Sequence, residues 1–480
     1  MGLIKRHLYL FIVGLILLLS LVTDWYYFLA VLLASATLVT MLDKLGKGIV
    51  LRELVVLHGV FIMLLMPIAG YEVYNKSNHL SRIFIKYMLV PKEQYFGFVL
   101  PAFAAFALAI CWPVNKKKIT LDEGAGFQYI LKDIRGKLLG NRYLGLYLII
   151  TGLAVSFASP ILPTALRFVW TLFYSGCFTG ILYVHFAPGF RHKKMVMILF
   201  ALFITYGAVQ TGVFTIVAYM GLTLFSFFFV GRRQAFWKKL LVCLIGAFFL
   251  FTLQSVKNNY RQQTWSQTYS GSKTGLFTDI AAQKLTHLDE MGDVNGLFPI
   301  YTRANQGFNV SMVMRYIPNQ KDFDHGERLT LVAASSLVPR VLWPDKPEAG
   351  GLESMLYFTG FKIHGWSTNV SPVGEAYGSF GVVGGIVFMF FLGLFIRWAY
   401  LRMFTLALKI PLLVLWVPVV FFQVTYSMET DTLQILNSIL KSSFFLWLIY
   451  KLIPVWFGVG KSTPHKWQVV NPIKKSLPDA

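Results

Sequence analysis

The stretch that decides the fold is "GSFGVVGGIVFMFFLGLFIRWAY", residues 378–400, in which Arg397 is the only charged residue. As a helix rising about 1.5 Å per residue, this stretch is long enough to cross a hydrocarbon core roughly 30 Å thick. Similar apolar runs recur along the 480-residue chain, which is 56% hydrophobic. Only 14% of the residues are charged, whereas soluble domains carry roughly 25%. The sequence therefore predicts an all-α polytopic membrane protein.

Twelve transmembrane helices are expected from these runs, and the first is read as a retained helix because no small-residue cleavage site follows it. The expected spans are 8–22, 26–42, 53–71, 97–113, 143–158, 164–186, 195–209, 211–230, 240–256, 378–400, 410–427 and 435–452. They divide the chain into an N-terminal membrane bundle of nine helices (1–256), an extracytoplasmic loop domain (257–377), C-terminal membrane helices (378–452) and a basic cytoplasmic tail (453–480).

Basic residues indicate the orientation of these spans. Every second connection between the expected spans would lie on the same side of the membrane as the two termini. Together with the termini, these segments hold 27 of the 44 Lys and Arg residues. Cytoplasmic loops of membrane proteins carry such an excess, so we expect both termini in the cytoplasm and the long loop outside. The same asymmetry explains the net charge of +22 without a nucleic-acid partner, and membrane lipid is the expected surrounding.

The segment between Lys257 and Lys362 differs from the other connections in both length and charge. It holds 11 basic and 10 acidic residues, so its charges do not orient the protein. "GLFTDIAAQKLTHLDEM" and "ERLTLVAASSLV" within it are typical of short helices. Long structured loops tend to be functional. On the opposite side, "FQYILKDIRGKLL" predicts an amphipathic helix at the membrane surface.

Charged residues at the ends of the long loop are candidates for substrate binding and catalysis. Lys257 and Arg261 are spaced i, i+4 at the end of the ninth span, where they either anchor the helix at the interface or clamp a lipid phosphate. Glu375 precedes the tenth span in the glycine-rich "GEAYGSFGVVGG". Small residues allow close helix approach, and the resulting dehydration would raise the pKa of this carboxyl group. A solvated glutamate is the alternative.

The segment "SSLVPRVLWPDKPEAGG", residues 335–351, has two interpretations. Its prolines fix the backbone φ angle at three points. The segment is therefore either a stiff connector or a rigid support that holds Arg340 in place for a ligand at a low ordering cost. Trp343 in the same segment would cover a sugar face or lie at the membrane interface.

The motifs "VKNNYR", "RANQG", "PRVLWPDKP" and "GEAYGSFGVVGG", in that order before a late span, resemble those of Wzy-type oligosaccharide repeat-unit polymerases. This O-antigen polymerase/ligase-like family consists of membrane glycosyltransferases. The resemblance covers roughly residues 250–390 by motif and the rest by architecture. Arg340 and Gly351 also have the R-x10-G spacing described for the family. The resemblance implies a GT-C-like fold in the bacterial cytoplasmic membrane, with the large loop before the tenth helix.

The resemblance further implies a polyprenyl-pyrophosphate-linked glycan as substrate, whose growing chain is transferred to the sugar of a fresh lipid-linked unit. The sugar–pyrophosphate bond already holds the energy, so no cofactor or metal is expected. Arg340 is the expected catalytic cation and Glu375 the expected base. The expected substrate-binding residues are Lys257, Arg261, Arg303, Arg315, Trp343 and His364, and His325 and His364 are reserve bases. A chain-length regulator protein is a possible partner.

Three other functions remain open at this stage. An O-antigen ligase would share the donor and the fold but would move the glycan to another acceptor. A flippase or other transporter of lipid-linked glycans would need polar groups along many spans, and few are found. A non-catalytic assembly scaffold is the third alternative.

Overall fold

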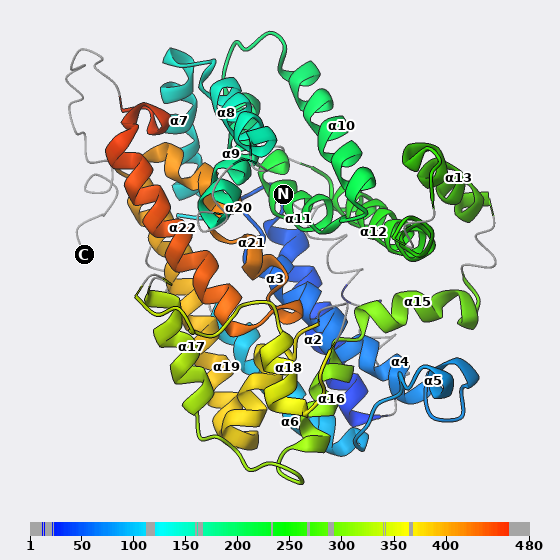
Figure 1. The fold of residues 1–480 in the computed structure, drawn as a ribbon. Helices are drawn as coiled ribbons and strands as arrows, with labels where there is room; N and C mark the ends of the chain where they lie inside the picture. Colours follow the sequence, from blue (N-terminus) through cyan, green and yellow to red (C-terminus); the bar gives the residue numbers. More distant parts are fainter. Residues whose placement is uncertain are drawn as a thin grey trace.

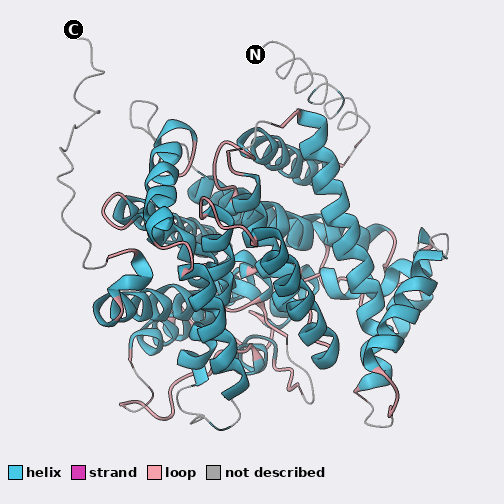
Figure 2. Cartoon of the chain, turned by 90° about the horizontal axis from the view of Figure 1, so that it is seen from above, coloured by secondary structure: helices cyan, strands magenta, loops and turns pink. Residues whose placement is uncertain are grey.

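The computed structural model describes residues 12, 14, 22, 24–111, 121–158, 161, 167–231, 234–265, 269–286, 292–338, 340, 342–363 and 368–459. These residues form helices joined by loops, and no strand occurs among them (Figures 1 and 2). The prediction of an all-helical fold is therefore confirmed.

Eight described helices are long and apolar enough to cross a membrane, as expected of a multi-pass membrane protein. They are α2 (Trp25–Lys44), the continuous α3–η1–α4 (Leu51–Val60, Phe61–Leu65, Met66–Glu72), α6 (Lys92–Cys111), α9 (Arg167–Phe186), α10 (Lys193–Thr211), α12 (Phe236–Thr264), α19 (Ser371–Ala407) and α22 (Thr432–Leu452). A ninth span results if α7 (Gly124–Gly140) and α8 (Leu144–Ala158), bent by 80°, are counted as one.

The structure accounts for the difference from the twelve expected spans. Most of the expected first span, 8–22, lies outside the described residues. The expected span 211–230 is the short helix α11 (Thr215–Phe229). The expected span 410–427 is broken into η4 (Pro411–Trp416), α20 (Val417–Val420) and α21 (Phe422–Thr425). Pro411 is the first residue of η4 and Pro418 is the second residue of α20, since a proline lacks the N–H that would continue a preceding helix.

The loop helices follow α12 and pack on the ends of the membrane helices. They are α13 (Lys273–Thr286), α15 (Val294–Ala304), α16 (Gly307–Tyr316), α17 (Glu327–Leu337) and α18 (Leu352–Thr359). Helix α15 packs on α12 and α4, α16 on α18 and α19, and α17 on α22 (Figure 1). The loop is shorter than expected at both ends, since α12 continues to Thr264 and α19 begins at Ser371.

Helices α6 and α19 pack closely against each other in the core. Gly393 of α19 lies so near α6 that a Cβ atom there would be 2.8 Å from the Cβ atom of Ala109. Phe98, Phe103 and Phe106 of α6 are fully buried along the same helix. Helix α19 also bends at Gly381, whose φ of +67° favours glycine.

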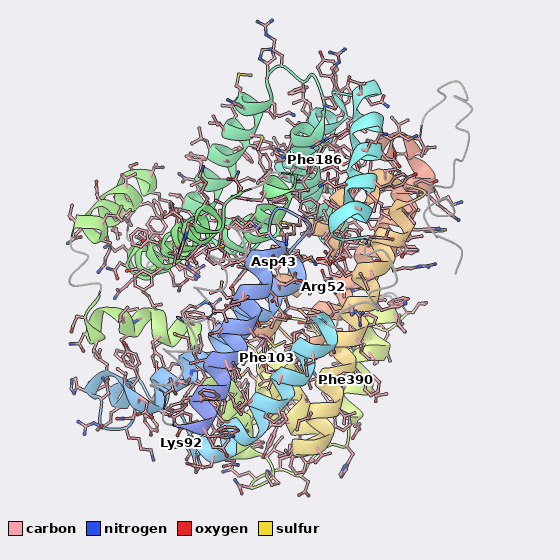
Figure 3. The ribbon with its side chains drawn as sticks, turned by 180° about the vertical axis from the view of Figure 1, so that it is seen from behind. Asp43, Arg52, Lys92, Phe103, Phe186 and Phe390 are labelled. Carbon is pink, nitrogen blue, oxygen red and sulfur yellow. The ribbon has the colours of Figure 1, made fainter. Side chains whose placement is uncertain are left out.

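A buried ion cluster joins α2, α3 and the segment just before α7. Lys44 donates to Asp122 at 2.8 Å and to Glu53 at 3.2 Å, and Arg52 donates to Asp122 at 2.7 Å. Figure 3 shows Arg52 far from Lys92, which lies near the end that carries the loop helices. The two positive and two negative charges balance, as buried charges generally require.

Candidate functional site

Lys257 and Arg261 lie on the last two turns of α12. The Lys257 side chain is buried, and no described acceptor lies within hydrogen-bond distance of its ammonium group. Arg261 donates through Nε to the Gly212 carbonyl at 2.7 Å and lies 4.3 Å above the Trp265 ring. The i, i+4 spacing thus places both cations on one helix face, as expected.

Arg303, the next-to-last residue of α15, donates to Glu429 in a charge-assisted bond. The Glu429 carboxylate is only 8% exposed, while the Arg303 side chain remains 38% exposed. His58 of α3 lies with its Nε2 atom 3.5 Å from the same carboxylate, and the Tyr219 hydroxyl of α11 hydrogen-bonds to it. Arg303 also lies close enough to Lys257 and Arg261 for their charges to interact.

We call this group the Glu429 cluster. Its members come from five separate parts of the chain and are His58, Tyr219, Lys257, Arg261, Arg303 and Glu429. Arg303 pairs with the one carboxylate, and Lys257 and Arg261 lie close to Arg303, so the cluster has an excess of positive charge even with His58 neutral. Because buried charge is costly without a partner, the arrangement is suited to an anionic ligand.

The pKa of Glu429 reflects its surroundings. Burial alone would raise this pKa, but the Arg303 charge and a hydrogen bond from His58 outweigh burial and hold it at about 2. Glu429 in turn raises the pKa of Arg303. Glu429 is therefore a permanent carboxylate that accepts hydrogen bonds and fixes the position of its neighbours.

The short segment 429–432 links the cluster to the rest of the fold. Asp431 caps α22 by accepting from the Gln434 N–H at 2.6 Å, and its other oxygen accepts from the Gly350 N–H at 3.1 Å. The Glu429 carbonyl accepts from Asn369 at 3.3 Å. Burial raises the pKa of Asp431. The segment thus joins α22 to the loop that precedes α18.

Glu375, the expected base, lies on the second turn of α19 beside Asp431. It is 1% exposed. One carboxylate oxygen accepts from the Thr432 N–H at 2.9 Å and the other accepts from the Ser354 hydroxyl at 3.3 Å. The expected dehydration by close helices is present, but both oxygens are used to join α18, α19 and α22. This geometry favours a structural role for Glu375.

Within the described part of the chain, Arg340, the expected catalytic cation, donates hydrogen bonds to acceptors of its own loop. Its guanidinium donates to the Pro344 carbonyl at 3.2 Å, the Lys346 carbonyl at 3.5 Å and the exposed Glu348 carboxylate at 3.2 Å. The charged groups shown to interact with Arg340 beyond this ion pair are Lys346 and Lys441, and neither belongs to the Glu429 cluster. This placement favours the connector interpretation of the segment.

The remaining expected residues are dispersed. Arg315 is exposed on α16, and Trp343 is half-buried in the loop that holds Arg340. His325 is exposed with a φ of +52°. His364 lies outside the described residues. The structure thus brings together Lys257, Arg261 and Arg303 from the expected set.

Sequence reasoning missed Glu429 and His58. A signal for Glu429 exists, because Glu429 and Asp431 are the only acidic residues between 376 and 478. Two carboxylates directly before an apolar span are costly to bury without partners. His58 gives no such signal, since a single histidine in an apolar run has no pattern. The described residues contain no group of three His, Cys, Asp or Glu side chains placed to hold a metal ion.

The fold and the site together define a class: a multi-pass helical membrane protein with a cationic cluster where its membrane helices meet its loop helices. The chain belongs to the family described as domain of unknown function DUF8712, whose model matches residues 60–453. That range includes every member of the Glu429 cluster except His58. No curated protein and no solved structure matches the chain.

Proposed function

We propose that the protein is a membrane glycosyltransferase that polymerises polyprenyl-pyrophosphate-linked oligosaccharide repeat units at the outer face of the bacterial cytoplasmic membrane. The observation that carries the proposal is the Glu429 cluster, where Lys257 and Arg261 lie beside the ion pair between Arg303 and Glu429. A pyrophosphate group would supply the missing negative charge, and Lys and Arg donate strong hydrogen bonds to phosphate oxygens.

The proposed reaction exchanges one bond for another. The acceptor hydroxyl oxygen attacks the anomeric carbon of the donor sugar, and the bond from that carbon to the pyrophosphate oxygen breaks. The bonding electrons leave with the pyrophosphate, whose growing charge Lys257, Arg261 and Arg303 stabilise. A base takes the proton of the acceptor hydroxyl. His58 is better placed for this step than Glu375, because it lies within the cluster and Glu429 orients its ring.

The proposal also includes the twelve-span, GT-C-like arrangement with both termini in the cytoplasm, and a chain-length regulator as partner. Alternating basic segments support this orientation. Beyond the eight long helices and the α7–α8 pair, the twelve spans would require residues 8–22, helix α11 and the broken segment 410–427.

The test is reconstitution of the purified protein with lipid-linked repeat units. Laddered products support a polymerase, a single transfer supports a ligase, and no transfer contradicts both. Lys257→Met is the most informative variant. Replacing a buried, unpaired cation by an apolar side chain removes a desolvation cost, so we expect thermal stability to rise.

Product formation by Lys257→Met should fall roughly 10- to 150-fold, because a charged hydrogen bond is worth about 1.5–3 kcal/mol. Arg402→Ala, at an exposed position near the opposite end of α19, is the matched control. A Lys257→Met protein with normal transfer would contradict the assigned role of the cluster.

A further inference from the structure

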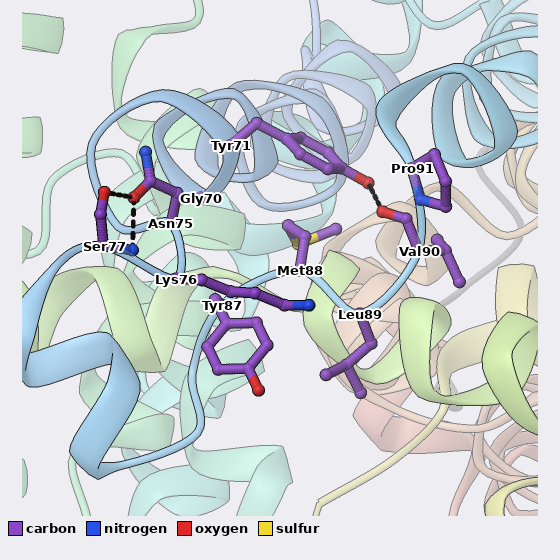
Figure 4. Close-up of a pocket in the computed structure, with 10 residues that line it drawn as sticks. All are labelled: Gly70, Tyr71, Asn75, Lys76, Ser77, Tyr87, Met88, Leu89, Val90 and Pro91. Atoms are coloured by element: carbon purple, nitrogen blue, oxygen red, sulfur yellow. Dashed lines mark hydrogen bonds between the residues drawn. The ribbon is translucent and has the colours of Figure 1, made fainter.

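A second candidate site lies beside α15. A pocket of about 570 Å³ opens between the end of α4 and the loop that precedes α6 (Figure 4). Tyr71, Asn75, Lys76 and Tyr87 line it together with residues 88–91. Its volume falls within the usual range of small-molecule sites, about 300–1,000 Å³.

Internal hydrogen bonds hold the walls of this pocket. The Tyr71 hydroxyl donates to the Val90 carbonyl at 2.9 Å. The backbone N–H of Ser77 donates to the Asn75 side-chain oxygen at 3.0 Å, and the Leu89 N–H donates to the Ser311 hydroxyl at 3.4 Å. The pocket is therefore formed before a ligand enters, which lowers the ordering cost of binding.

The chemistry of the lining limits the class of ligand. Lys76 is its one charged residue, and it lies 5.5 Å from the centre of the Tyr87 ring. Among the described residues, none forms a hydrogen bond with the Lys76 ammonium or the Tyr87 hydroxyl. An aromatic ring packs against the C–H groups of a pyranose, while amide, hydroxyl and ammonium groups bond to its oxygens. The single cation without a lining carboxylate favours a sugar that carries negative charge.

The pocket contacts the helix that carries Arg303. A Cβ atom at Gly70 would lie 2.8 Å from the Tyr301 hydroxyl and 3.2 Å from the Asn305 side chain. The Tyr301 hydroxyl donates to the Lys86 carbonyl at 2.7 Å, which ties α15 to the pocket loop. Because Arg303 lies between Tyr301 and Asn305 on α15, a ligand in the pocket lies next to the helix that supplies a cation to the Glu429 cluster.

We infer that this pocket binds a saccharide unit of the glycan, with preference for an acidic sugar. The inference rests on the proposed function, because the glycan class comes from it. It adds a second point of attachment, separate from the pyrophosphate, that would hold the sugar chain in position relative to the cluster.

Saturation-transfer NMR on the full-length protein in detergent tests the inference. The probe is a partial acid hydrolysate of the surface polysaccharide of the source cell, which supplies free sugars without lipid or pyrophosphate. We expect saturable transfer to sugar protons, weakened roughly 2- to 10-fold by Tyr87→Ala through loss of the ring contact. Lys76→Gln should weaken binding of acidic sugars more than that of neutral sugars. Tyr129→Ala, at an exposed tyrosine of α7, should bind like the parent.

The outcomes separate this inference from the proposed function. Absence of saturable transfer, or equal transfer in Tyr87→Ala and the parent, would overturn the inference even if the protein makes polymer. Sugar binding that depends on Tyr87 in a protein that transfers no glycan would overturn the proposed function and leave the pocket as a saccharide site.

Discussion

Lys346 and Arg340 show how one loop can use two cations for its own structure. The Lys346 ammonium is buried and donates to the carbonyls of Ser335 and Val338 at 2.9 and 2.6 Å. These carbonyls belong to the end of α17, where backbone acceptors lack helical partners. Burial lowers the pKa of Lys346. Arg340, which is more exposed, donates to the carbonyls of Pro344 and Lys346 in the same loop.

These contacts predict opposite sensitivities for the two residues. Lys346→Met should lower the free energy of unfolding by about 1–3 kcal/mol, because it leaves buried carbonyls unpaired. Arg340→Lys should have little effect on stability or glycan transfer, while Pro344→Gly loosens the turn. Thermal unfolding and transfer at matched protein levels measure these effects. Severe loss of transfer in Arg340→Lys, with normal stability, would restore Arg340 as a ligand-binding residue.

The pKa of Glu429 predicts how acid affects the cluster. Its folded pKa of about 2 lies below the ordinary value of 4.5, because Arg303 and His58 outweigh burial. The stabilising contribution is therefore complete above pH 4.5 and is lost as the pH falls toward 2. The difference in melting temperature between the parent and Glu429→Gln should shrink over that range.

Glu348→Gln is the control for this measurement. Glu348 also pairs with an arginine, but its side chain is 71% exposed, and exposed pairs contribute little. Its difference from the parent should stay small throughout. A Glu429→Gln difference that is constant from pH 6 to 2.5 would show that the carboxylate is not held by Arg303.

At the scale of elements, Gly307 shows why α16 begins where it does. A Cβ atom at Gly307 would lie 2.1 Å from the Tyr95 hydroxyl and 2.4 Å from a Pro67 side-chain atom. The "RANQG" motif therefore needs its glycine for close packing of α16 on η1, α4 and α6. By contrast, a Cβ atom at Gly97 in α6 would have no neighbouring atom within 4 Å.

The two glycines predict changes of opposite sign. Gly307→Ala should destabilise the protein by about 1–3 kcal/mol through overpacking. Gly97→Ala should stabilise it by about 0.5–1 kcal/mol, because alanine loses less backbone entropy in a helix. Melting temperatures of the purified variants compare them. Equal changes in melting temperature in the two variants would contradict the close packing of Gly307 against Tyr95 and Pro67.

Elements with a clear pattern could be predicted from the sequence. Phe127, Ile130, Leu131, Ile134 and Leu138, placed by periodicity on one face, are the buried face of α7. The region 410–427 could not be predicted, because its apolar composition is that of a span while its prolines divide it into short pieces. The position of Lys257 and Arg261 on one face of α12 could be predicted from their i, i+4 spacing. Their proximity to Glu429 could not, because it depends on the contact between Arg303 and Glu429, which are 126 residues apart in the sequence.

For the whole molecule, the orientation in the membrane is a prediction that cysteine labelling can check. Single cysteines replace exposed Gln320, in the expected outer loop, and exposed Lys132, on α7. The background lacks Cys111, Cys177 and Cys243. An impermeant maleimide applied to intact cells should label position 320 and not position 132. Labelling of position 132 alone would reverse the orientation.

The pairing of Arg303 with Glu429 also has a consequence for biosynthesis. The ribosome adds Glu429 126 residues after Arg303, when α12, the loop helices and α19 have already been translated. Until then the nascent chain carries the three cations of the cluster without their carboxylate. The Glu429 cluster is thus completed only when the segment just before α22 has been made. A translation product that stops before residue 429 lacks the carboxylate of the cluster.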